Sequence, residues 1–337
     1  MNPMSPPQIM ASILAGLIIF AIHALAGLAV NFSLLITLFF SILTPLPLAL
    51  ISFRLGTAAS LLTLFTATAA MMATSTPLYA VTYNIFFLLP SFCGCWLLGL
   101  LETSNTENSC NEETNNWFPL NSTLSLLGAF VSFLSFLLVV FLHKHPTFQE
   151  ITHVISTQVT ENIKVLQQQN IVDATKADKM IPELTQNIIP LLFSWFALYG
   201  LIIGLLNLYI SSKISWKNAW TARPEDNWAQ AFQMPMASLI TLASFIILPM
   251  LSESFFIKMS SFIVISCFSF LFLLSGLAAV HRMTRAFSGR IFILTIFYFL
   301  LLGTILIIPL SILLFLIGVW TTLSKNKAYF KLKSERN

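Results

Sequence analysis

Apolar residues run through this chain in long stretches that short polar stretches separate. A helix needs about 20 apolar residues to cross the ~30 Å hydrocarbon core of a bilayer. The runs of about this length or longer lie at 9–30, 32–52, 56–74, 79–101, 122–142, 188–210, 235–252, 255–280 and 290–320. None of them alternates apolar and polar residues as the strands of an outer-membrane barrel do. The pattern predicts an all-α polytopic membrane protein with about eight or nine transmembrane helices.

Composition supports this class, because 57% of the 337 residues are hydrophobic and only 9% are charged, whereas soluble domains carry roughly 25% charged residues. The expected solvent and first partner is therefore the lipid bilayer. The formal net charge is +4 and no long basic run exists, so nucleic acid is not an expected partner. Lys and Arg in short loops are typical of the cytoplasmic loops of a multi-pass protein in a bacterial inner membrane.

Two of the apolar runs contain features that interrupt a helix. Pro45 and Pro47 each remove a backbone donor, so the second run is expected to kink or end near Thr44, where it could line a cavity. The alternative is a kink that neighbouring helices tolerate. The run 290–320 would be ~45 Å long as one helix, and basic residues flank it on both sides. We therefore expect a helix followed by an interfacial or re-entrant segment after Pro309.

The polar stretch 143–187 is predicted to form an amphipathic helical loop. Residues 147–150, Thr-Phe-Gln-Glu, match a capping box. Apolar residues then recur at steps of three and four, at Phe148, Ile151, Ile155, Val159, Ile163 and Leu166. Asp173 could cap a second helix, whose course Pro182 interrupts. Such helices lie on a bilayer surface or cover the mouth of a bundle.

The distribution of Lys and Arg predicts a topology. With Arg54, the 213–223 loop and the 282–290 loop in the cytoplasm, the span count leaves the amphipathic loop outside. The loop at 102–121 contains acidic residues and no basic residue, which suits a solvated segment but says little about its side of the membrane.

The span interiors carry no Asp, Glu, Lys or Arg, which disfavours a proton-coupled pump or an ion pathway with charged rings. No nucleophile elbow, zinc-protease motif or phosphate-binding loop is present. We therefore expect no enzymatic activity, no cofactor and no metal site. His143, His145 and His153 could hold a divalent ion, but they lack a carboxylate or thiolate complement, so solvated histidines are the preferred interpretation.

Small residues at four-residue spacing predict close contacts between helices. The pairs are Ala11 with Ala15 in the first span and Gly200 with Gly204 in the sixth. The motif does not say whether the partner helix belongs to this chain or to another protein, and packing within the chain is the default interpretation.

Residues 275–282, Ser-Gly-Leu-Ala-Ala-Val-His-Arg, precede a basic turn, an apolar run with Tyr298, Pro309 and Leu-Ile-Gly-Val-Trp at 316–320. This arrangement resembles the C-terminal signature of the YybS-like bacterial membrane proteins, a family without an established activity. That family is distantly similar to the S components of energy-coupling-factor transporters, whose first helix carries an Ala-x-x-x-Ala contact for the coupling subunit. Ala11 and Ala15 match that spacing, although S components usually have fewer spans.

The resemblance implies a substrate-binding component of a small-molecule uptake system, with ATPase and coupling subunits as partners. Asn207 and His281 are the candidate hydrogen-bonding groups of a pocket between helices, which the broken second helix would help to line. The alternative is a non-catalytic scaffold for cell-envelope or division machinery, which would bind other membrane proteins through the small-residue faces and the amphipathic loop.

Overall fold

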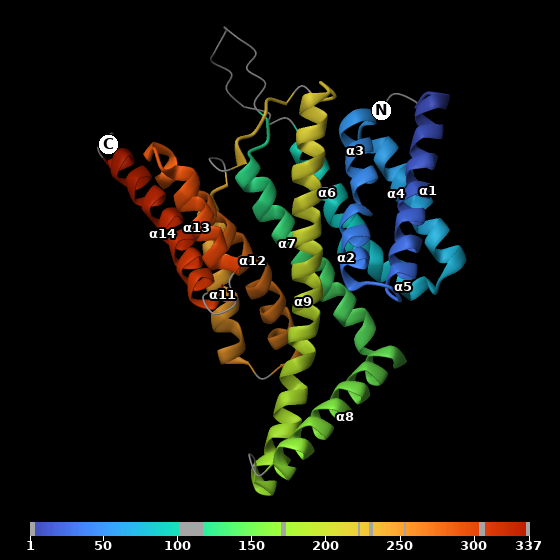
Figure 1. Cartoon of the computed structure of the whole chain (residues 1–337), viewed down its shortest axis with the longest axis vertical. Helices are drawn as coiled ribbons and strands as arrows, with labels where there is room; N and C mark the ends of the chain where they lie inside the picture. Colours follow the sequence, from blue (N-terminus) through green and yellow to red (C-terminus); the bar gives the residue numbers. More distant parts are fainter. Residues whose placement is uncertain are drawn as a thin grey trace.

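The computed structural model describes residues 4–100, 117–169, 173–221, 223–228, 232–252, 254–302 and 307–334, and every element in these ranges is a helix (Figure 1). Eight of the described helices are long and apolar enough to cross a membrane. The prediction of an all-α polytopic membrane protein is therefore confirmed. The helices of the N-terminal part are α1 (Pro6–Ala29), α2 (Leu34–Leu43), α3 (Leu46–Leu55), α4 (Thr57–Thr74), α5 (Pro77–Tyr83), the π-helix η1 (Asn84–Leu88) and α6 (Leu89–Leu98). The remaining helices are α7 (Leu120–His143), α8 (Pro146–Gln168), α9 (Ala174–Lys217), α11 (Met236–Leu251), α12 (Phe255–Met283), the short η2 (Thr284–Ala286), α13 (Arg290–Leu302) and α14 (Ile307–Ser334).

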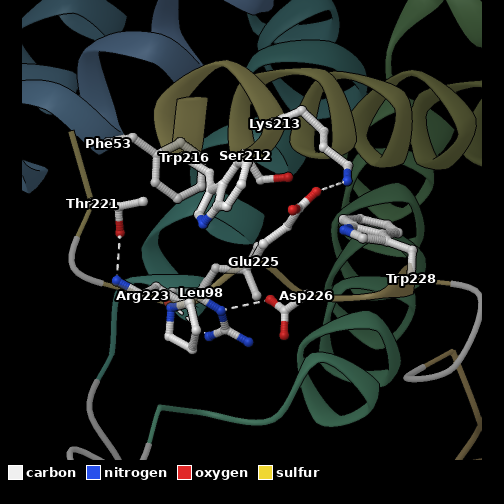
Figure 2. A pocket seen from close by; sticks show the side chains of 11 residues that line it. Phe53, Leu98, Ser212, Lys213, Trp216, Thr221, Arg223, Glu225, Asp226 and Trp228 are labelled. Carbon is white, nitrogen blue, oxygen red and sulfur yellow. Dashed lines mark hydrogen bonds and ion pairs between the residues drawn. The ribbon is translucent and has the colours of Figure 1, made fainter. Parts of the chain in front are cut away.

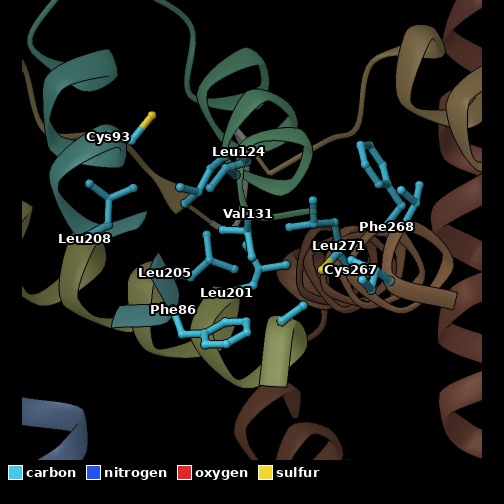
Figure 3. Packing of buried hydrophobic residues seen from close by; sticks show 14 of the residues in the cluster. Phe86, Cys93, Leu124, Val131, Leu201, Leu205, Leu208, Cys267, Phe268 and Leu271 are labelled. Carbon is cyan, nitrogen blue, oxygen red and sulfur yellow. The ribbon is translucent and has the colours of Figure 1, made fainter. Parts of the chain in front are cut away.

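Helix α9 is the central element of the bundle. It packs against α3 and α6 of the N-terminal part and against α7 and α12 of the C-terminal part, and it stands between the two groups in Figure 1. Its buried side chains join those of α7 and α12 in the largest apolar core, in which Leu201 and Leu205 lie near Val131 and Leu271 (Figure 3). A single long helix therefore fixes the relative positions of the two groups.

Proline interrupts the second span where the sequence predicts it. Helix α2 ends at Leu43 and α3 begins at Leu46, with Pro45 and Thr44 between them. The two short helices together still make one span, Leu34–Leu55. The chain then reverses at Gly56, whose φ of 88° lies in the left-handed region that glycine adopts without steric cost.

The run 290–320 divides into two helices that turn back on each other, α13 and α14 (Figure 1). Pro309 lies inside the first turn of α14 and does not end a helix; Gly303, the other residue that could break the run, is outside the described residues. Helix α14 packs tightly on α12, because a Cβ atom built on Gly276 would overlap the carbonyl oxygen of Leu314. Helix α13 remains at the outside, and most of its large apolar side chains are exposed.

Two other spans differ from the predicted runs in length. The run 235–252 forms only the 16 residues of α11, ~24 Å at 1.5 Å per residue, which is shorter than a usual span. The run 188–210 is part of α9, which has 44 residues and continues through Pro182 and Pro190. The expected second helix of the amphipathic loop is therefore the first part of α9.

Helix α8 and the first part of α9 form what we call the arm, which projects beyond the end of the bundle in Figure 1. The apolar stripe of α8 is buried here, because Val159 and Ile163 pack against Met180, Ile181 and Ile188 of α9. The expected capping box at 147–150 is not formed. Instead His145 is the N-cap, and its Nδ1 accepts a hydrogen bond of 3.2 Å from the backbone N–H of Thr147.

Basic side chains gather at the end of the bundle opposite the arm. Arg54 of α3 lies 5.0 Å from the ring centroid of Trp220, just beyond α9, and α1 begins and α14 ends at the same end (Figure 1). We call this the basic end. Its basic residues lie at helix ends and in the connections between them, and include Arg54, Lys213, Lys217, Arg223, Arg282, Arg285 and Arg290.

Candidate functional site at the basic end

The segment that follows α9 carries a buried arginine that ties three parts of the chain together. The guanidinium of Arg223 donates to the carbonyl oxygens of Leu98 at 3.0 Å and Phe118 at 2.9 Å, and its Nε donates to Asp226 at 2.7 Å (Figure 2). Its side chain is only 8% exposed. Five N–H donors in a rigid fork allow arginine to satisfy several acceptors at once. Arg223 therefore holds the segment against the ends of α6 and α7.

A second ion pair lies beside the first but is more accessible. Lys213 on the last turns of α9 donates to Glu225, and their side chains are 40% and 35% exposed (Figure 2). Lys213, Glu225 and Asp226 line a polar pocket of about 450 Å³ together with Asn227, Tyr209 and Trp228.

An apolar groove of about 710 Å³ adjoins this polar pocket. Its walls come from α9, α12, α13 and the segment after α9, and its apolar lining includes Ile202, Leu205, Leu206, Phe232, Phe270, Leu274, Leu277 and Ala278. The two hollows share Tyr209 and Trp228, whose rings meet edge to face at a centroid distance of 5.2 Å. The groove volume falls in the ~300–1,000 Å³ range of small-molecule sites.

Hydrogen bonds to α12 and α14 hold the chain segment around Phe232, which forms one wall of the groove. The side chain of Arg282 donates to the carbonyl oxygen of Phe232 at 3.5 Å, and Gln233 donates to that of Thr321 at 3.2 Å. Thr322 of α14 donates to the carbonyl oxygen of Met234 at 3.2 Å. These bonds join the segment to α12 and α14, so the groove is a preformed feature of the bundle.

The groove contains one polar pair, His281 of α12 and Tyr298 of α13. The His281 Nε2 and the Tyr298 hydroxyl are 2.6 Å apart, and an Arg290 guanidinium nitrogen lies 3.5 Å from His281 Nδ1. An imidazole and a phenol hydroxyl can each donate or accept a hydrogen bond. The groove therefore offers a hydrogen bond to an oxygen or nitrogen atom of a ligand.

The structure separates the two residues predicted to bind substrate. His281 lines the groove, whereas Asn207 is 1% exposed and does not line it. The Asn207 amide donates to the carbonyl oxygens of Ile42 at 2.8 Å and Ile203 at 2.9 Å. Asn207 therefore supports the break between α2 and α3, and the residues of that break are not part of the groove lining.

The small residues singled out in the sequence lie in contacts within the chain. Gly200 rests directly on the carbonyl oxygen of Phe86 in η1, where a Cβ atom would overlap it, and Gly204 faces Pro90 of α6. Ala15 is buried and Ala11 is half-buried. The neighbouring Ser12 contacts α4, because the Thr63 hydroxyl donates to its carbonyl oxygen at 3.1 Å.

From the sequence alone, Arg223 and Lys213 are predicted only as loop charges, Tyr298 enters only through the family resemblance, and Trp228 is expected only at the headgroup region. The spacing of Arg223 and Asp226, three residues apart, is a signal for an ion pair that could have been used. The groove itself has no such signal, because helices distant in sequence build it. In the described residues, no group of three or more His, Cys, Asp or Glu side chains could hold a metal ion.

The fold and the groove define a polytopic α-helical membrane protein with a preformed hollow at the basic end. The chain belongs to the family described as "Predicted membrane protein (DUF2232)", whose model matches residues 18–320. No curated protein and no solved structure matches the chain.

Proposed function

We propose that this protein is a non-catalytic, substrate-binding membrane component that holds a small, largely apolar molecule in the groove between α9 and α12. The observation that carries the proposal is the groove of about 710 Å³, whose mostly apolar lining includes the His281–Tyr298 pair and, at the border with the polar pocket, Tyr209 and Trp228. A mostly apolar hollow with a few oriented polar groups is the usual form of a ligand site. These groups would select a ligand that carries a hydrogen-bonding group.

The distribution of charge supports a location for this function. Short loops rich in Lys and Arg stay in the cytoplasm, so we propose that the basic end faces the cytoplasm of a bacterial cell and that the arm lies outside. The resemblance to S components of uptake systems favours ATPase and coupling subunits as partners. Because Ala15 is buried within this chain, a coupling subunit would have to contact a surface other than the Ala15 face.

Native mass spectrometry of the protein, extracted gently from its own membrane, tests this function. Leu206 lines the groove and Leu191, on the same helix, is an exposed residue outside the groove lining. We expect wild type and Leu191→Trp to retain a small-molecule mass and Leu206→Trp to lose it, because the larger ring fills the groove. Equal retention by both tryptophan variants would refute the assignment of the site.

A second candidate function, a scaffold for envelope or division machinery, is favoured by the projecting arm. Val154 on α8 is 56% exposed on this arm, so a partner protein could reach it. A photo-crosslinking residue at Val154 should then trap one membrane or envelope protein reproducibly, and should do so equally well in the Leu206→Trp background. Loss of the cross-link in that background would connect the arm to the groove and argue against an independent scaffold.

A further inference from the structure

The groove and the polar pocket adjoin each other, and the first has an apolar lining while the second has a charged lining. Tyr209 and Trp228 belong to both linings and mark the boundary between them. Ile202 to Tyr209 lie along the groove, and Lys213 follows one turn later on α9. A molecule that occupies both parts needs a hydrocarbon portion and a polar portion in that order along the helix.

The polar part carries balanced charge. Lys213 and Glu225 of its lining are paired with each other, and its second anion, Asp226, is paired with Arg223, which lies outside the lining. A ligand group with a single charge would bind one residue of an ion pair and leave the other residue without a counter-charge. An unpaired charge away from bulk water is energetically costly. A group that carries both signs can bind Lys213 through its anion and Glu225 through its cation, so that every charge keeps a partner.

The two ion pairs differ in how readily a ligand can replace them. The Arg223–Asp226 pair is 8% and 25% exposed and also binds two backbone carbonyls, so it is a structural pair. The Lys213–Glu225 pair is 40% and 35% exposed and lines the pocket. Trp228 and Tyr209 line the same pocket, and aromatic faces attract ammonium groups. Lys213 itself already lies 6.0 Å from the Tyr209 ring centroid.

The position of the polar part also corresponds to the headgroup region of a bilayer. It lies at the basic end, next to Trp216 and Trp228, and indole rings favour the headgroup region of a membrane. The groove continues from there along α9 and α12, toward the interior of the hydrocarbon region.

We infer that the ligand is a zwitterionic amphiphile whose hydrocarbon chain occupies the groove and whose headgroup exchanges with the Lys213–Glu225 ion pair. This inference rests on the proposed function, since it names the ligand class of the same site. Lys213 binds the anionic part, Glu225 binds the ammonium, and Trp228 closes the headgroup from the side of the loop.

Competition for a photoreactive probe tests the inference. The probe is dodecylphosphocholine with a diazirine at the chain end, added to the full-length protein in nanodiscs of phosphatidylglycerol. The competitors have the same dodecyl chain and differ in headgroup: phosphocholine, trimethylammonium, carboxylate and alcohol. We expect saturable labelling of α9 and α12 peptides that line the groove, and displacement by dodecylphosphocholine at a concentration about tenfold lower than by the other three, equivalent to roughly 1.4 kcal/mol.

Two variants separate the charge effect from binding itself. Lys213→Gln/Glu225→Gln should abolish the preference for phosphocholine while chain-dependent labelling persists, and Lys164→Gln on the arm should leave the preference unchanged.

If wild type shows no preference among headgroups while Leu206→Trp still removes the label, the proposed function stands and the zwitterionic ligand is refuted. If wild type shows no saturable label at all, the proposed function fails first. Native mass spectrometry then assigns the source: a phospholipid mass identifies a bilayer lipid, and another zwitterionic mass identifies a separate substrate.

Discussion

The side-chain amide of Asn207 donates a hydrogen bond of 2.8 Å to the carbonyl oxygen of Ile42, across the contact between α9 and the broken second span. A proline-interrupted helix leaves backbone carbonyls without their usual partners. Asn207 satisfies one of them, so its role in this fold is to stabilise the break. Asn207 therefore lies outside the groove lining and is placed to support the break between α2 and α3.

Replacing Asn207 by Leu should lower stability without changing ligand binding. The variant loses the bond to Ile42, which joins two helices, and the bond to Ile203 within α9. A hydrogen bond between membrane helices contributes about 0.6 kcal/mol on average and at most about 1.7 kcal/mol. The free energy of unfolding in lipid nanodiscs measures the loss. Asn218→Leu, at the exposed end of α9, serves as the control with a smaller effect. Weakened binding at unchanged stability would return Asn207 to the site.

Arg223→Met should be among the most destabilising substitutions at the basic end. It leaves Asp226 and the carbonyls of Leu98 and Phe118 without their donor, and breaking a buried pair from one side costs about 3–5 kcal/mol. The double variant Arg223→Met/Asp226→Leu should recover part of the loss, because it removes the unpaired carboxylate. Thermal unfolding of both variants, with the exposed Arg285→Met as control, checks this. No recovery in the double variant would show that the carbonyl contacts, and not the ion pair, determine the cost.

Gly276→Ala should separate α12 from α14, because the added methyl overlaps the Leu314 carbonyl oxygen. Overpacking of this kind costs about 1–3 kcal/mol. Gly27→Ala in α1 is a matched control, since nothing lies within 4 Å of a Cβ there, and it should be neutral or slightly stabilising. The two variants are compared by thermal unfolding and by protease resistance of the C-terminal region. Equal stabilities would mean that the close crossing of α12 and α14 does not form.

Gln158→Cys on the arm and Ser288→Cys after η2 should label from opposite sides of the membrane. Both positions are exposed, and the Cys93, Cys95 and Cys267 side chains are buried, so only Cys110 needs prior replacement by Ser. With the basic end in the cytoplasm, a membrane-impermeant maleimide reaches Gln158→Cys in intact cells and Ser288→Cys only after permeabilisation. The reverse pattern would invert the topology and place the ligand headgroup outside the cell.

The sequence predicts the class of fold well and the site only in part. Hydropathy predicts the all-α membrane class, whereas the extents of α9, α11, α13 and α14 differ from the predicted runs. Pro45 with Pro47 predicts the end of α2. In contrast, α9 continues through Pro182 and Pro190, although a proline inside a helix usually kinks or ends it. Packing of α9 against its neighbours accounts for this continuity. Thr147–Glu150 matches a capping box, yet Pro146 fits the first helical position, so His145 becomes the cap.

The contact between His281 and Tyr298 in the groove is a second feature that the sequence does not predict. His281 was identified from its polar character in an apolar helix, but its partner Tyr298 lies beyond the turn that joins α12 to α13. Whether the two meet depends on the turn at 284–289, which no periodicity encodes. Asn207, a polar residue inside the apolar part of α9, turns toward α2 instead. A rotation of less than half a helical turn on α9 separates a groove residue from a structural one, and single-sequence patterns do not resolve it.

A cryo-electron microscopy map of the wild-type protein in nanodiscs of its native lipids tests whether the groove between α9 and α12 holds an amphiphile. We expect an elongated density along Leu206 and Leu274 that ends in a larger feature between Lys213 and Glu225, with the Tyr298 hydroxyl beside it. The same map of Leu206→Trp should lack that density. A groove closed by its own side chains, or density of equal strength in the two maps, would contradict the account.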